Sequence, residues 1–155
     1  KPIPREKFIA AYDDIAPLVE IVDARSLETG GRRLNFFEVL VAIAFAAFAD
    51  APVDVAVIEG GLGGSWDATN VANGQVSVIM PVDLDHMAYL GTTISEIAAE
   101  KAGIIRTGQQ VIVAAHHPDA IDDIPAKAAE VGSGVGRAGL DFWGIRLCFP
   151  APPST

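Results

Sequence analysis

The chain has 155 residues, of which 50% are apolar, and this is enough to fill the core of one domain. Its net charge is −9, and residues 34–131 alone carry three basic against thirteen acidic side chains. This excess of acid argues against a nucleic-acid partner, which would need a basic surface, and it suits a cation site.

The single cysteine, Cys148, excludes a disulfide within the chain and fits a reducing compartment. The sequence does not open on the charged and then apolar pattern of a secretory signal. Its longest apolar run, residues 39–49, is shorter than the roughly 20 residues that a bilayer span takes. We therefore expect a soluble, cytoplasmic protein with no membrane partner.

Two helices are predicted in the N-terminal third. Residues 4–23 carry apolar side chains at three-to-four-residue spacing, and Pro17 should kink or restart this helix. Asn35 and Glu38 form a capping-box pattern that opens a second helix, which runs to about residue 49. Because this second helix is apolar almost all round, we expect it to be buried.

Three strands are predicted farther along, at residues 53–58, 75–80 and 110–114. The second of them is apolar on both faces, as strands of parallel sheets are. Strands that alternate with helices indicate an α/β fold with a mostly parallel sheet and flanking helices.

Two more helices are predicted between and after these strands. Thr93 and Glu96 form another capping-box pattern, which starts a short helix that Gly103 ends. Residues 118–131 form the last predicted helix, and residues 132–155 show no sustained period of either kind. We therefore divide the chain into a domain at residues 1–131 and a tail at residues 132–155 that is irregular or does not belong to the fold.

A glycine-rich turn follows the first predicted strand. The strand ends on Glu59, and the turn runs over residues 60–64. A carboxylate followed by a turn with few Cβ atoms is typical of sites for polyphosphates or metal ions in α/β proteins. The candidate cofactor-binding residues in this stretch are Gly61, Gly63, Gly64, Asp67, Thr69 and Asn70.

A second group of polar residues follows the next strand, where His86 comes after Asp83 and Asp85. Since the carboxyl ends of parallel strands lie along one edge of a sheet, Glu59 and His86 should approach each other there. Oxygen ligands, sometimes with one imidazole, suit Mg²⁺. Glu59 and His86 are therefore the candidate metal ligands.

Each of these residues also has an ordinary structural interpretation. A glutamate at a strand end more often caps or forms an ion pair, and Lys101 alone would be a solvated lysine that the helix dipole favours. Asp67 and the residues after it would ordinarily form a turn. A dinucleotide-binding interpretation of the glycines is disfavoured, because the turn does not open directly into a helix.

Three motifs taken in order separate these interpretations. The sequence contains Glu-x-Gly-x-Gly-Gly-x-x-Asp-x-Thr-Asn, then Leu-Asp-His-x-x-x-Leu-Gly-x-Thr, then Ile-Ala-x-Glu-Lys-Ala-Gly-Ile-Ile. Over residues 35–131 this order resembles the central, ATP-binding domain of folylpolyglutamate synthase/dihydrofolate synthase, a relative of the Mur ligases. Members of that family use ATP to form an acyl phosphate on a pteroate or folate carboxylate, which the amine of L-glutamate then displaces.

The resemblance implies roles for individual residues. Glu59 and His86 correspond to magnesium ligands between the ATP phosphates and the substrate carboxylate. Lys101 corresponds to a catalytic lysine that is commonly carbamylated and then gives a second Mg²⁺ an oxygen ligand. Asp67, Thr69 and Asn70 correspond to the wall of the site. The implied cofactors are ATP and Mg²⁺, and the implied form of the whole enzyme is a monomer.

The sequence also departs from the family pattern. It contains no Gly-x-x-x-x-Gly-Lys-Ser/Thr, so no lysine is placed to hold the β- and γ-phosphates. The family's phosphate loop should precede Lys1, and its C-terminal domain is missing as well. We therefore expect a fragment that is inactive alone. The alternative is a non-catalytic pseudo-enzyme or interaction module that keeps the α/β fold.

Overall fold

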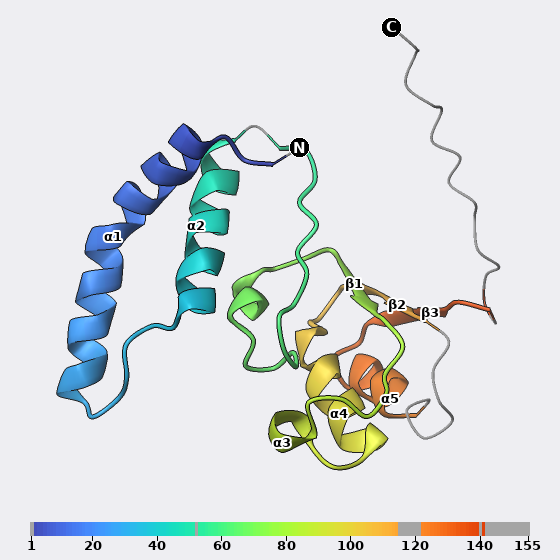
Figure 1. Cartoon of the computed structure of the whole chain (residues 1–155). Coiled ribbons are helices and arrows are strands. Elements are labelled where there is room, and N and C mark those ends of the chain that lie inside the picture. Colours follow the sequence, from blue (N-terminus) through green and yellow to red (C-terminus); the bar gives the residue numbers. More distant parts are fainter. Residues whose placement is uncertain (1, 52, 115–121, 140, 142–155) are drawn as a thin grey trace, which may run out of the picture. The chain divides into compact units, whose positions relative to one another are not determined.

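The computed structural model describes residues 2–51, 53–114, 122–139 and 141 (Figure 1). The chain divides into two compact units, Lys1–Gly61 and Leu62–Thr155. Among the described helices, none is long and apolar enough to cross a membrane.

The first unit is a pair of helices, α1 (Arg5–Glu28) and α2 (Phe36–Asp50), which pack along each other around Ala11, Ile15 and Ile43. Helix α1 continues through Pro17 and ends five residues beyond the predicted end. A helix that is already packed against a neighbour can continue through a proline, because the packing offsets the lost hydrogen bond.

The start of α2 is as the sequence predicts. The Asn35 side chain accepts a hydrogen bond from the Glu38 amide at 2.9 Å, and the Glu38 carboxylate accepts one from the Asn35 amide at 2.6 Å. This reciprocal pair satisfies two of the amides that a helix start leaves without partners.

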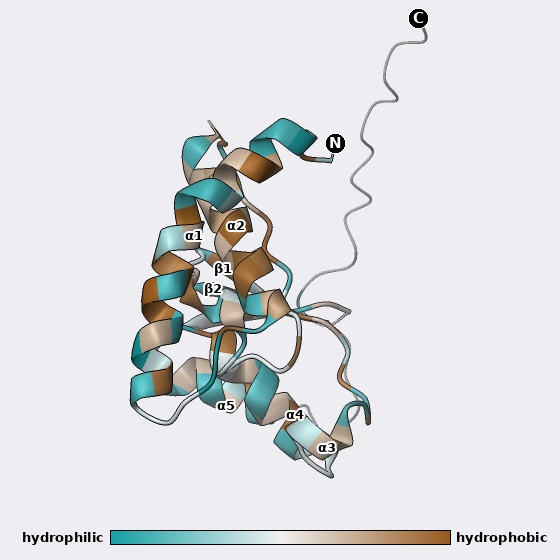
Figure 2. Cartoon of the chain, turned by 60° about the vertical axis from the view of Figure 1, so that its left-hand side comes forward, coloured by the Kyte–Doolittle hydropathy of each residue, from teal (hydrophilic) through white to brown (hydrophobic). Residues whose placement is uncertain are grey.

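The prediction that α2 is buried is wrong. Only Ile43 is buried, and Phe36 is 79% exposed. Figure 2 shows hydrophobic residues over much of the surface of α2. One neighbouring helix can cover only one face of an all-apolar helix, and α1 is its neighbour in this unit.

An apolar cavity of about 640 Å³ opens within this unit. Its lining includes Phe8 from α1 and Leu40 and Phe48 from α2, together with the charged residues Lys7, Asp14 and Asp50. The first unit therefore leaves apolar surface uncovered on more than one side.

The second unit is built on a parallel sheet with strand order β1 (Val76–Ile79), β2 (Gln110–Val113) and β3 (Gly134–Arg137). Helices α3 (Met87–Leu90), α4 (Ile94–Lys101) and α5 (Asp123–Glu130) accompany the sheet (Figure 1). The parallel α/β class predicted from the sequence is confirmed.

The core of this unit lies between the sheet and two of its helices. Ile97 of α4, Ile124 of α5 and Val111 of β2 are its largest fully buried side chains. β1 alternates between exposed and buried residues, and Val76 and Val78 are 56% and 51% exposed. β1 thus carries apolar residues on both faces, as the sequence indicates, but only the face that α4 and α5 cover is buried.

The predicted strand at residues 53–58 is not formed. Val55 and Val57 are 79% and 89% exposed, and the sheet among the described residues begins with β1. A strand is defined by its hydrogen-bonded neighbour, and an apolar β-branched sequence cannot supply one by itself.

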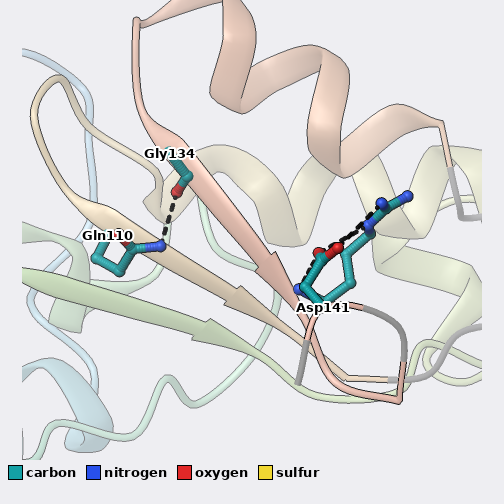
Figure 3. A network of polar contacts seen from close by, with 4 residues as sticks. Gln110, Gly134 and Asp141 are labelled. Carbon is teal, nitrogen blue, oxygen red and sulfur yellow. Dashed lines mark hydrogen bonds and ion pairs between the residues drawn. The ribbon is translucent and has the colours of Figure 1, made fainter.

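Part of the predicted irregular tail is a strand, since β3 pairs in parallel with β2 over four residues. The side-chain amide of Gln110 donates to the Gly134 carbonyl at 3.3 Å (Figure 3). The Asp141 carboxylate accepts from the Arg137 backbone amide at 2.8 Å and from the Arg137 guanidinium at 3.0 Å. The hydrogen bonds from Arg137 also lower the pKa of Asp141.

Residues 140 and 142–155, which include Trp143 and Cys148, lie outside the described residues, as do His116 and His117.

The helix after Thr93 starts as predicted and ends differently. Thr93 accepts from the Glu96 amide at 3.2 Å, and Glu96 accepts from the Thr93 amide at 3.1 Å. Helix α4 continues into a 3₁₀ turn, Ala102–Ile104, so that Gly103 lies inside a turn and does not terminate the helix. The last helix, predicted from residue 118, is α5, and residues 118–121 lie outside the described part.

The capping box of α4 predicts an acid-dependent loss of stability. Hydrogen bonds from the amides of Thr92 and Thr93 lower the pKa of Glu96 below its ordinary value of 4.5. The ionised carboxylate therefore stabilises the fold fully above pH 4.5, and this contribution disappears as the pH falls through the folded-state pKa. We expect Glu96→Gln to lower the thermal midpoint at pH 7 more than at pH 3. A difference between wild type and variant that stays constant over this range would contradict the prediction.

Candidate functional site

The glycine-rich turn is held in shape by Asp67. One carboxylate oxygen of Asp67 accepts from the Leu62 amide at 2.8 Å, and the other accepts from the Thr69 amide at 2.9 Å and from the Thr69 hydroxyl. Asp67 is 7% exposed and caps the 3₁₀ turn Ala68–Val71. Asp67 and Thr69 thus bond to groups within the turn itself.

The backbone amides of the turn are occupied by a carboxylate of the same chain. Glu100 Oε1 accepts from the Gly64 amide at 3.2 Å and from the Ser65 amide at 2.9 Å. Two successive amides that converge on one oxygen form an anion-binding site. In this structure the anion that they bind is Glu100, a residue that the sequence analysis did not select.

The turn packs directly on the end of α4. A Cβ atom on Gly64 would lie 2.6 Å from the carbonyl oxygen of Glu100 and 2.7 Å from that of Lys101. A Cβ atom on Gly103 would lie 2.0 Å from Ser65 Oγ. These two glycines are therefore required for close backbone approach, and this contact brings Lys101 against the glycine turn.

Asn70 joins the same two segments. Its side-chain amide donates to the Ser65 carbonyl at 3.1 Å and to the Gly103 carbonyl at 3.2 Å. Arg106 in turn donates to the Asn70 carbonyl and, at 3.3 Å, to its side-chain oxygen. The first and third sequence motifs thus contribute to one connected structure in the second unit.

His86 lies in a different setting. It adopts a left-handed backbone conformation, with φ of 50°, just before α3. Its amide donates to Asp85 Oδ1 at 2.7 Å, and its Nε2 lies 3.7 Å from Asp85 Oδ2, with the imidazole 58% exposed. A non-glycine residue in this conformation costs energy, and such residues occur often at functional sites.

The predicted magnesium ligands are divided between the two units. Glu59 belongs to the first unit and is exposed, whereas His86 and Lys101 belong to the second. Among the described residues, no three His, Cys, Asp or Glu side chains are grouped to hold a metal ion. Glu59 fits Mg²⁺ because it offers carboxylate oxygens. The Lys101 ammonium does not fit as it stands, because its positive charge would repel a cation unless it were modified.

The chain is 43% identical to the dihydrofolate synthase/folylpolyglutamate synthase of Mycobacterium tuberculosis, in an alignment that covers 94% of this chain and 32% of that protein. It is 36% identical to the folylpolyglutamate synthase of Lacticaseibacillus casei, over 96% of this chain and 36% of that protein. No family model matches the chain.

Solved structures give the same result. The Mycobacterium tuberculosis folylpolyglutamate synthase complexed with ADP and AMPPCP superposes with a TM-score of 0.82 at 45% identity, over 88% of this chain and 31% of that one. A folylpolyglutamate synthase–AMPPCP–folate complex gives a TM-score of 0.76 at 39% identity, with the same 88% of this chain covered.

The fold and the ordered motifs define part of a Mur-ligase-type central domain. By sequence and by fold, the chain belongs to the dihydrofolate synthase/folylpolyglutamate synthase family. It spans about one third of the length of the relatives that it matches.

Proposed function

We propose that this chain forms the metal-binding side of an ATP- and magnesium-dependent ligase site that adds L-glutamate to a pteroate or folate carboxylate. The main support is the 43% identity to the Mycobacterium tuberculosis enzyme, which extends over 94% of the chain. Solved relatives are named as complexes with ADP, AMPPCP and folate, which are the ligands that this activity would need.

Three residues carry the proposal. Glu59 and His86 would hold one Mg²⁺, and Lys101, as a carbamate, would give a second Mg²⁺ an oxygen ligand. To form the carbamate, the uncharged Nζ attacks CO₂, a new N–C bond forms, and one proton leaves to water. The modification replaces a positive charge with a negative one, and it thereby removes the repulsion between Lys101 and the metal.

When bound, Mg²⁺ would neutralise the phosphate charge that builds up during phosphoryl transfer. The glycine turn contributes rigidity, because Asp67, Asn70 and Glu100 already occupy its polar groups. Within these 155 residues no Gly-x-x-x-x-Gly-Lys-Ser/Thr is present, so we propose that they do not turn over substrate by themselves.

The metal proposal can be tested on the chain with Mn²⁺ as a paramagnetic substitute for Mg²⁺. Binding would be measured by water-proton relaxation for wild type, Glu59→Gln, His86→Ala and the double variant. We expect each single variant to bind Mn²⁺ at least about tenfold more weakly, since altered metal surroundings commonly cost that much. The double variant should bind no more than slightly weaker than either single one, because both residues share one ion.

Glu130→Gln is the matched control, since Glu130 is exposed in the last turn of α5 and pairs with Lys127. It should leave Mn²⁺ binding unchanged. If each single variant loses one of two bound Mn²⁺ ions, Glu59 and His86 bind different ions, and unchanged binding in both single variants would exclude them as ligands.

A further inference from the structure

We infer that Glu100 is a positioning residue that fastens the glycine turn to the end of α4 and so fixes the point from which Lys101 extends. This inference rests on the proposed function, because the role of Lys101 belongs to it. The contact of Glu100 with Gly64 and Ser65, which we call the clamp, lies entirely within the second unit.

The bonds between Glu100 and the turn use both its side chain and its backbone. Glu100 Oε1 accepts from the amides of Gly64 and Ser65, at 3.2 and 2.9 Å. The Glu100 carbonyl accepts from the Ser65 amide at 3.2 Å and from the Ser65 hydroxyl at 3.3 Å. Gly64 and Ser65 are therefore bonded to Glu100 through several atoms, although they lie 36 and 35 residues from it in the sequence.

The charge of Glu100 is not explained by helix stability. Glu100 lies in the last turn of α4, where the helix dipole is negative and disfavours an acid. The two amides of the turn compensate for this by donating to the carboxylate, and hydrogen bonds to an ionised acceptor are stronger than neutral ones. An acid at this position is thus accounted for by the turn that it binds.

The consequence for Lys101 follows from the packing. The Lys101 backbone lies against Gly64, where a Cβ atom would come within 3.0 Å of the Lys101 Cα atom. Because Glu100 holds the turn in this contact, the start of the Lys101 side chain has little freedom. Loss of the clamp would let the turn move away and would leave Lys101 at a frayed helix end.

The test uses Glu100→Ala, Glu100→Asp and Glu100→Gln in the 155-residue chain, with amide hydrogen exchange followed by NMR. Gln keeps an acceptor oxygen at the same reach, whereas Asp keeps the charge but is one methylene too short. We expect the Ala and Asp variants to lose about tenfold or more of the protection at Gly64 and Ser65, and Gln, whose neutral oxygen accepts more weakly at the same reach, to lose less than either. Glu130→Ala, which removes an acid from the last turn of α5, should change neither amide.

A second measurement follows Lys101 itself, by the carbamate carbon signal in ¹³C-bicarbonate. This signal should weaken in the Ala and Asp variants and return in the Gln variant. Unchanged protection in Glu100→Ala, or equal losses in the Gln and Ala variants, would overturn the clamp. A carbamate signal that is unchanged in Glu100→Ala would overturn the positioning of Lys101. If wild type gives no carbamate signal while the exchange pattern is as expected, the clamp is supported and the proposed role of Lys101 fails.

Discussion

Gly64→Ala is expected to destabilise the second unit by about 3 kcal/mol, which is at the upper end for an added methyl group in a packed site. The new Cβ atom would lie 2.6 Å from the Glu100 carbonyl oxygen, 2.7 Å from that of Lys101 and 3.0 Å from the Lys101 Cα atom. All three neighbours are backbone atoms, so no side chain can rotate away to make room. Native-state hydrogen exchange of the β2 amides would measure the loss, because it reports on this unit by itself.

Gly134→Ala is the control for this variant. Gly134 lies in β3, and a Cβ atom there would meet only the Gln110 side chain, at 3.6 Å or more. Its φ is not in the left-handed region, so alanine should leave the stability unchanged or raise it by up to about 1 kcal/mol. Equal effects of the two substitutions would mean that the turn does not pack against α4 as described.

Gln109→Ala is expected to cost a similar amount, about 3 kcal/mol, for a different reason. Gln109 is 6% exposed, and its side-chain oxygen accepts from the Arg106 amide at 2.8 Å and from the Ser77 hydroxyl at 2.7 Å. Its side-chain amide donates to the Gly74 carbonyl at 2.8 Å. Alanine would remove three hydrogen bonds at the start of β1 and β2, one of them buried and two partly buried.

The neighbouring Gln110→Ala provides the matched control, because that side chain is exposed and makes one hydrogen bond of 3.3 Å to Gly134 (Figure 3). It should change the stability by less than about 0.5 kcal/mol. The stabilities of the two variants would be compared by urea denaturation and by hydrogen exchange of the β2 amides. A Gln109→Ala variant as stable as Gln110→Ala would show that water replaces the buried amide without cost.

The strand at residues 53–58 shows where the sequence misled. Its β-branched, apolar residues are typical of a buried strand, and yet Val57 is 89% exposed and the segment is unpaired. β3 is the opposite case, a glycine-rich segment of four residues with no clear pattern that pairs with β2. Pairing depends on which partner lies alongside, and a strand's own composition does not contain that information.

The sequence by itself determined the features that depend on nearby residues. Both capping boxes join groups three residues apart, so that spacing alone was enough to predict them. The parallel α/β class and the family likewise follow from the order of motifs and the alternation of strands and helices.

Only the tertiary structure decided what the glycine turn binds. The sequence pattern left this stretch open to a polyphosphate site, a metal site or an ordinary turn. In the structure the amides of Gly64 and Ser65 donate to Glu100, which lies 35 residues or more away in sequence. Glu100 resembles any acid at a helix end until the backbone of the turn is placed against it. A contact between distant segments is set by the packing of the whole unit, and local spacing does not encode that packing.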